Sequence, residues 1–83
     1  MSFITDLADD LARDTLKVMD ATGQDRLYVE VAEVLAAAST TMEEEYLTCI
    51  RVRLAERRGR AFLTKLAKEA RSRAVDGTDA PET

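Results

Sequence analysis

Apolar residues recur every three or four positions through the first twenty residues, and charged residues fill the positions between them. At 100° per residue this spacing gathers the apolar side chains on one side of an amphipathic helix from Ser2 to Asp20. Ser2 or Thr5 is expected to cap its start, and Thr22-Gly23 to supply the left-handed exit that glycine adopts without strain. The predicted apolar face consists of Ile4, Leu7, Leu11 and Val18, with Ala8, Ala12 and Met19 beside them.

A second apolar segment is predicted from Asp25, as the N-cap, to about Ala38. The stretch from Leu27 to Val31 is rich enough in β-branched residues to suggest a strand. A lone strand would leave its backbone donors and acceptors unmatched, and no second strand is evident, so a helix is favoured. Its predicted apolar side consists of Leu27, Val31, Val34, Leu35 and Ala38.

A third and much longer helix is predicted over residues 42–74. Thr41 to Glu44 fits a capping box, in which the threonine and glutamate side chains each accept a hydrogen bond from the other residue's backbone N–H. Gly59 lies inside this segment, where glycine costs about 1 kcal/mol relative to alanine without breaking a helix. The alternative is that Gly59 marks a turn into a fourth short helix.

The third helix carries two separate apolar stripes. The first passes through Leu47, Ile50, Leu54 and Ala61. The second, which we call the seam, consists of Val52, Ala55, Gly59, Phe62 and Leu66, and its spacing of 3, 4, 3, 4 is typical of a helix packed along another helix. Because the two shorter helices cannot cover both stripes over the whole length, we expect a dimer in which the seams of two third helices cross or run antiparallel near Gly59.

These elements predict an all-α fold: a small three-helix domain in which two shorter helices pack on one long C-terminal helix. The single helical domain is expected to span residues 1–74. Residues 75–83 contain little that can be buried and are predicted to form a disordered tail.

The size and composition of the chain favour oligomerisation. A domain of 83 residues buries only about 60 to 65% of the surface of its unfolded form, so its stability is marginal. With Cys49 as the only cysteine and no histidine, neither an internal disulfide nor a tetrahedral metal site is expected. Cys49 lies among apolar residues and is interpreted as a small buried thiol rather than a reactive one. A homodimer is the favoured source of added stability.

Charge is strongly segregated along the chain. Residues 1–50 carry a net charge of -8, from three basic and eleven acidic side chains, whereas residues 51–73 carry +7, from nine basic and two acidic ones. The basic helix offers contacts to an anionic partner through Arg51, Arg53, Arg57, Arg58 and Arg60. Its cations are spread round the helix, so mutual neutralisation with the acidic half is favoured over nucleic-acid binding.

Two further sequence patterns have a functional interpretation, but a structural one is favoured for each. The segment from Val31 to Met42 resembles the core of a helix-turn-helix, but the recognition helix would begin with Glu43-Glu44-Glu45, against the phosphate backbone. Asp9-Asp10 and the three glutamates are interpreted as a solvated helix face and a favourable first turn.

The residue set contains no arrangement typical of an enzyme: no histidine, no glycine-rich phosphate loop and no convergent catalytic or cofactor-binding group. The start lacks a secretory signal and no segment approaches the roughly 18 apolar residues of a membrane span, so a cytoplasmic location is expected. Nine arginines against three lysines, with thirteen alanines, are typical of a GC-rich bacterial coding sequence.

We therefore expect a non-enzymatic helical protein that self-associates through its third helix, binds no cofactor and serves as an interaction or regulatory module, with another protein as a further partner. Nucleic-acid binding through residues 51–73 is the alternative. A small ligand-binding bundle is the third hypothesis, for which the sequence supplies no pocket residues.

Overall fold

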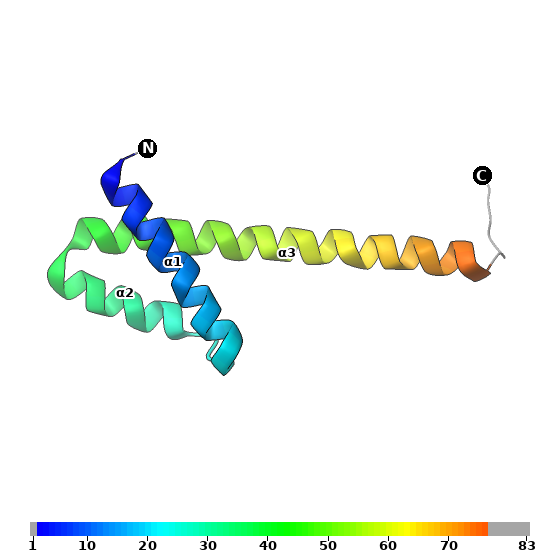
Figure 1. Cartoon of the computed structure of the whole chain (residues 1–83), viewed down its shortest axis with the longest axis horizontal. Coiled ribbons are helices and arrows are strands. Elements are labelled where there is room, and N and C mark those ends of the chain that lie inside the picture. Colours follow the sequence, from blue (N-terminus) through cyan, green and yellow to red (C-terminus); the bar gives the residue numbers. More distant parts are fainter. Residues whose placement is uncertain (1, 77–83) are drawn as a thin grey trace.

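The protein consists of three helices, of which the third is by far the longest. The computed structural model describes the backbone of residues 2–76 and the side chains of residues 2–74. Within this range α1 spans Phe3–Thr22, α2 spans Leu27–Ala38 and α3 spans Thr40–Asp76, with no strand among them. Both short helices pack on the first part of α3 (Figure 1). The predicted all-α fold of two short helices on one long helix is confirmed.

The ends of α1 follow the chemistry of its terminal residues. Ser2 is the N-cap, and its hydroxyl oxygen accepts a hydrogen bond of 3.1 Å from the backbone N–H of Thr5. Gly23 ends the helix with φ of 75°, and its N–H donates to the Met19 carbonyl at 2.8 Å. Glycine adopts this left-handed backbone without the steric penalty of a Cβ, which confirms the predicted exit.

The junction between α2 and α3 is a single residue, Ser39. Its N–H donates to the Leu35 carbonyl at 2.7 Å, and its hydroxyl oxygen accepts from the N–H of Met42 at 3.1 Å. Ser39 therefore closes one helix and caps the next. The predicted capping box that starts at Thr41 is wrong, because the helix begins at Thr40, two residues before the predicted start, and Ser39 caps it.

The start of α2 also differs from the prediction. Its N-cap is Arg26 rather than Asp25, and no side chain makes a capping hydrogen bond there. The backbone N–H of Leu27 instead bonds the Gln24 carbonyl at 3.4 Å, and that of Val29 bonds the Arg26 carbonyl at 3.0 Å. Backbone hydrogen bonds of a turn thus take the place of the capping bond that was expected from the Asp25 carboxylate.

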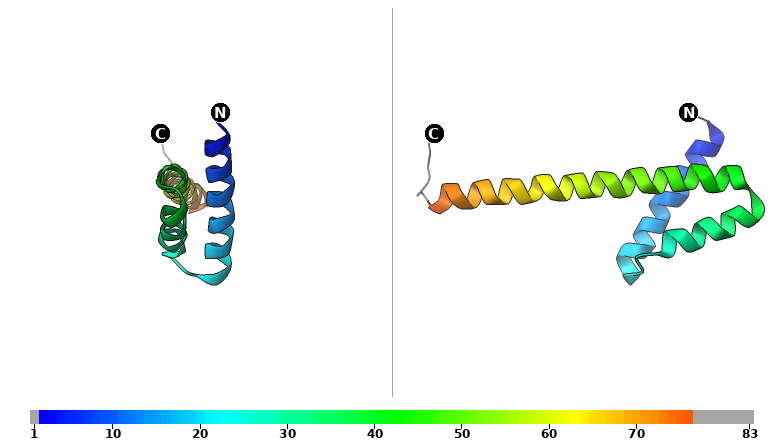
Figure 2. Two further views of the ribbon diagram at one scale, coloured as in Figure 1. Left: turned by 90° about the vertical axis from the view of Figure 1, so that its left-hand side faces the viewer. Right: turned by 180° about the vertical axis from the view of Figure 1, so that it is seen from behind.

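Helix α3 runs without interruption through Gly59. Its 37 residues extend about 55 Å at 1.5 Å per residue, so the alternative of a fourth helix after Gly59 is wrong. Every described side chain from 55 to 74 is exposed, and this distal half of α3 projects beyond the other two helices (Figure 2). The predicted tail is described only at 75 and 76, whose backbone continues α3; the expectation of disorder at 77–83 lies outside the described residues.

The remainder, from α1 through residue 54, forms what we call the head. Its core is assembled from small side chains on the two short helices and two large ones on α3. Tyr46 and Ile50 are the largest fully buried side chains. They contact a surface formed by Ala8, Ala12, Leu16 and Ala32. Alanine at these positions lets helix axes approach closely, and a small head without room for many large side chains uses this packing.

Several predicted core positions are wrong for this reason. Leu7 and Val18 of α1 are 44% and 47% exposed, and Val34 of α2 is 72% exposed. The face of α1 that packs inward is rotated toward the alanines, and α2 buries Ala32 instead of Val34. Leu47 and Leu54 of the first stripe are half-buried beside Ile50, whereas Ala61 lies in the exposed distal half.

A buried hydroxyl pair ties α1 to α3. The Tyr46 hydroxyl donates to Thr15 Oγ1 at 3.0 Å, and that hydroxyl donates in turn to the Leu11 carbonyl at 2.8 Å. Both polar groups are thus satisfied inside the core, where an unpaired hydroxyl is costly. Burial raises the pKa of Tyr46, so the phenol stays protonated and able to donate.

Candidate functional site

The seam is the most extended apolar feature left uncovered. Val52, Phe62 and Leu66 are 62%, 60% and 44% exposed, and Ala55 and Gly59 between them are also exposed. Leu63 adds a further side chain beside the seam at 64% exposure. The five predicted residues thus share one face of one continuous helix, and the described part of the chain leaves that face exposed.

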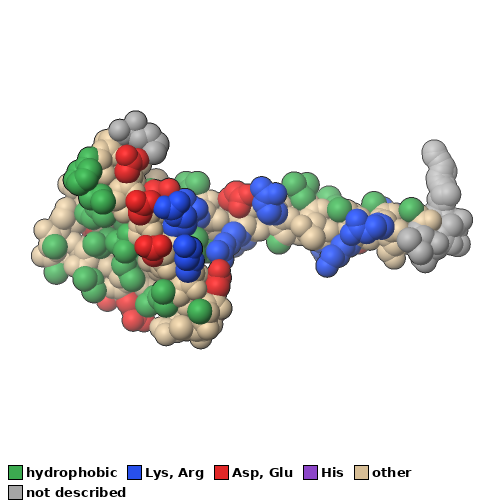
Figure 3. Space-filling model, viewed as in Figure 1, with side chains coloured by type: hydrophobic (Ala, Val, Ile, Leu, Met, Phe, Trp, Pro, Cys, Tyr) green, Lys and Arg blue, Asp and Glu red, His purple; other side chains and the backbone are tan. Residues whose placement is uncertain are grey.

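The seam lies on the side of α3 opposite the head. At 100° per residue, Gly59 is about 180° round the helix from the buried Ile50, and Leu66 is about 160° from it. Hydrophobic side chains follow mostly one edge of the projecting part of α3 (Figure 3). A second helix could therefore lie along the seam without displacing α1 or α2.

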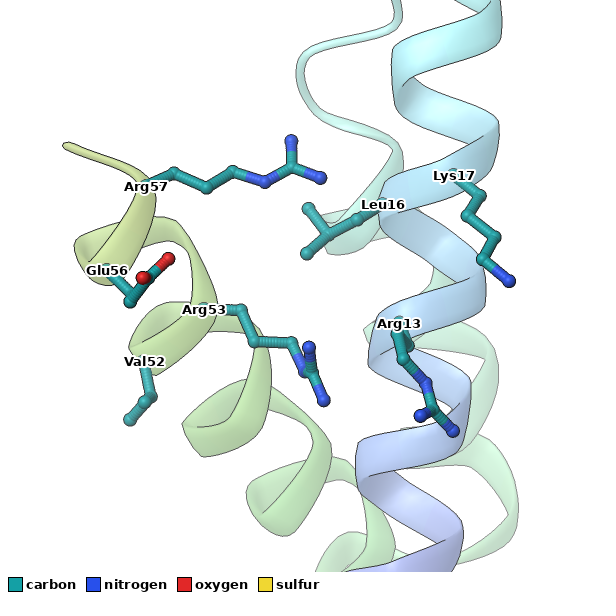
Figure 4. Close-up of a pocket in the computed structure, with 7 residues that line it drawn as sticks. All are labelled: Arg13, Leu16, Lys17, Val52, Arg53, Glu56 and Arg57. Carbon is teal, nitrogen blue, oxygen red and sulfur yellow. The ribbon is translucent and has the colours of Figure 1, made fainter. Parts of the chain in front are cut away.

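A groove bordered by cations lies where α1 meets α3, and it adjoins the seam at Val52. It has a volume of about 350 Å³. Arg53 and Arg57 extend from α3 toward α1, and Leu16 extends from α1 toward α3 (Figure 4). The groove is lined by Arg13, Leu16, Lys17, Val52, Arg53, Glu56 and Arg57.

Most of these cations are paired with acidic residues. Arg53 binds Asp9 through two hydrogen bonds of 2.8 Å each, and Arg57 binds Asp20 through bonds of 2.9 and 3.0 Å. Both pairs have the two-bond geometry in which a planar guanidinium matches a carboxylate. They join the basic helix to the acidic α1, as the charge segregation suggested.

Shorter-range pairs hold two further arginines. Arg60 binds Glu56 one turn earlier on α3 at 2.6 Å, and Arg13 binds Asp10 on α1. Of the five arginines predicted to contact an anionic partner, Arg53, Arg57 and Arg60 thus have carboxylate partners. Arg51 and Arg58 are exposed and form no ion pair among the described side chains.

Asp9 is a correction to the sequence analysis, which placed it on the solvated face of the first helix. It lies half-buried at the edge of the contact between α1 and α3. The hydrogen bonds from Arg53 lower the pKa of Asp9 and raise the pKa of Arg53, against an opposing effect of desolvation. The Arg57 guanidinium likewise lowers the pKa of Asp20.

This pair predicts loss of stability in acid. Because the pKa of Asp9 is lower in the folded state than in the unfolded state, its contribution is complete above about pH 4 and is lost as pH falls through the folded value. The effect is modest, since the Arg53 and Asp9 side chains are 33% and 36% exposed. Urea unfolding from about pH 6 to about pH 3 should show a falling free energy of unfolding, less steep in Asp9→Asn. An equally steep fall in Asp9→Asn would show that this pair contributes nothing; Asp14→Asn is the matched surface control.

A second groove of about 350 Å³ lies beside the same contact, nearer the starts of α1 and α3, and shares Val52 and Arg53 with the first. It is lined by Thr5, Asp9, Glu45, Thr48, Cys49, Val52 and Arg53. Cys49 is half-buried there rather than fully buried. Desolvation, with the nearby Asp9 and Glu45 charges, raises the pKa of this thiol, so little reactive thiolate forms near neutral pH.

Among the described side chains, no three of the types that bind metals come together. Over residues 2–76, none of the helices has the combination of length and apolar character that a membrane crossing requires. The geometry thus leaves two surfaces of interest, the seam and the cationic groove.

Sequence reasoning missed the acidic partners of these arginines and the buried hydroxyl pair. The excess of acidic residues in the first half signalled the ion pairs in general, but it did not identify Asp9 and Asp20. Tyr46 lies one turn before Ile50, and this spacing was the available signal for its burial.

Comparison with protein-family models, with curated proteins and with solved structures finds no match for this chain.

Proposed function

We propose that the protein is a non-enzymatic helical module that self-associates through the seam and in the dimeric state presents two heads to other proteins. The supporting observation is the exposure of Val52 near the end of the head, and of Phe62 and Leu66 on the projecting half, along one face of α3. Large apolar side chains repeated along one helix face are typical of an interaction surface.

The energetics of the distal half support the same proposal. Residues 55–74 are good helix formers, with alanine, leucine, arginine and lysine predominating, but long helices draw most of their stability from packing of an apolar face. Among the described residues, the contact of this segment with the short helices is the ion pair of Arg57 with Asp20. A second copy supplies the missing contact.

The ion pairs weigh against an anionic partner as the main ligand. Arg53, Arg57 and Arg60 already bind carboxylates. A phosphate would have to displace these carboxylates, each of which accepts two hydrogen bonds from its arginine. The absence of histidine from the chain supports a role outside acid–base catalysis.

Sedimentation equilibrium tests self-association. We expect micromolar protein to show twice the 9.2 kDa mass of the chain, with little dependence on salt because the contact is apolar. A stable monomer at this concentration would overturn the proposal. A mobility shift with RNA or DNA that persists at physiological ionic strength would favour the basic helix as the functional surface instead.

A further inference from the structure

We infer that the two copies pair antiparallel, with the two Gly59 residues at the centre of the contact. This inference rests on the proposed self-association and specifies its geometry. In such a pair, a residue a given number of positions before Gly59 lies opposite the residue the same number after it. The seam, its flanking charges and the adjacent groove can each be compared with that register.

The seam places large side chains opposite small ones in this register. Val52 and Leu66 lie seven positions before and after Gly59, so each Val52 faces Leu66 of the partner subunit. Ala55 lies four before and Phe62 three after, so the aromatic ring faces the smallest side chain that a helix offers besides glycine. At the centre the two glycines let the backbones approach closely.

The charges beside the seam are complementary in the same register. Glu44 lies fifteen positions before Gly59 and Arg73 fourteen after; Arg51 lies eight before and Glu69 ten after. At 100° per residue, all four lie within about 40° of one another on one flank of the seam. All are exposed, and none forms an ion pair among the described side chains.

The symmetry of the pair decides whether these charges meet. The two-fold axis of an antiparallel pair lies across the helices, so the same flank of each helix meets the same flank of the other. Glu44 then meets Arg73 of the partner subunit, and Arg51 meets Glu69 of the partner subunit. A parallel pair would bring Glu44 and Glu45 of both copies together at one end and both Arg73 residues together at the other. Like charges at the ends therefore oppose the parallel arrangement.

The other flank of the seam fits the groove that contains Cys49. That groove opens beside Val52 and Thr48, between the seam and α1. Thr48 lies eleven positions before Gly59 and Ala70 eleven positions after it. In the antiparallel register, Thr48 therefore lies opposite Ala70 of the partner subunit. The residues on this flank of the distal half are Leu63, Ala67 and Ala70, all uncharged and small enough to lie over the groove. Each distal half thus covers the partner's head.

Disulfide trapping distinguishes the arrangements. In the Cys49→Ser background, Val52→Cys and Leu66→Cys chains are prepared separately and then mixed in oxidised glutathione, which accepts the two electrons and two protons that each disulfide releases. We expect neither chain to crosslink to its own kind, because equivalent residues lie about 20 Å apart along the helix, beyond the roughly 7 Å that a disulfide spans. The main product of the mixture should be a covalent dimer of one Val52→Cys chain and one Leu66→Cys chain.

Lys65→Cys is the matched control, since it is one residue from Leu66 but about 100° round the helix, off the seam. It should not crosslink with Val52→Cys. Self-crosslinking of Val52→Cys would establish a parallel pair and overturn the inference. The absence of the mixed disulfide in chains that sediment as dimers would also overturn the inference. If the unmodified protein is monomeric, the proposed self-association itself fails, and this result is distinct from both.

Discussion

Replacing Gly59 with leucine is expected to convert the dimer into a monomer while leaving the helix intact. A Cβ at Gly59 meets no atom within 4 Å apart from the adjacent backbone of its own helix, so the side chain is accommodated in the monomer. Leucine is also a better helix former than glycine by nearly 1 kcal/mol. In the dimer, two leucines at the centre of the contact would force the backbones apart. Sedimentation velocity should show the mass halved, and circular dichroism should show undiminished helix content.

Arg58→Leu is the control for this variant, because residue 58 is adjacent, exposed and on a different face of α3. It adds the same side chain off the seam and should leave the dimer unchanged. If Gly59→Leu sediments as a dimer, the seam is not the contact. If it loses helix content as a monomer, Gly59 has a role within the chain that the open space around it does not indicate.

The helices could be predicted from sequence because their signals are local. The periodicity of α1, the left-handed glycine at its end and the capacity of α3 to pass through Gly59 each depend on residues within a few positions of one another. The helix starts at Leu27 and Thr40 were harder, because several Ser, Thr and Asp residues near each junction could serve as the cap. At Leu27 none of these side chains forms a capping hydrogen bond, whereas Ser39 forms one at the start of α3.

The core was less predictable because hydrophobicity does not specify how closely helices approach. Val34 and Val18 are more apolar than Ala32 and Ala12, yet the alanines are buried. Where α1 and α2 pack on Tyr46 and Ile50, the buried positions they contribute are mainly alanine, whereas Val18 and Val34 lie exposed. This preference depends on the crossing of the helices, which no single segment encodes.

The candidate site also has one part that could be predicted from the sequence and one part that could not. The seam lies on one continuous helix, so its five residues could be placed together by spacing alone. The pairing of Arg53 with Asp9 joins residues 44 positions apart, and it depends on where α1 crosses α3. Charge segregation along the chain indicated attraction between the halves but not which side chains meet.

The head and the distal half of α3 are distinct in their energetics, and Ile50→Ala is expected to separate them. Ile50 is fully buried at the centre of the head, so removing three carbons should cost about 2–5 kcal/mol, from lost burial and from the cavity that remains. In a head of this size such a loss is a large share of the total stability. Urea unfolding followed by circular dichroism should show a markedly lower midpoint.

Val34→Ala is the matched truncation, at a side chain 72% exposed on α2, and should change stability by about 0.5 kcal/mol or less. If the two variants unfold alike, Ile50 is not the centre of the core. Because the seam residues lie about 120–180° round the helix from Ile50, Ile50→Ala chains kept below the unfolding midpoint should still sediment as dimers. Retention of the dimer in Ile50→Ala and its loss in Gly59→Leu would assign folding and association to opposite faces of one helix.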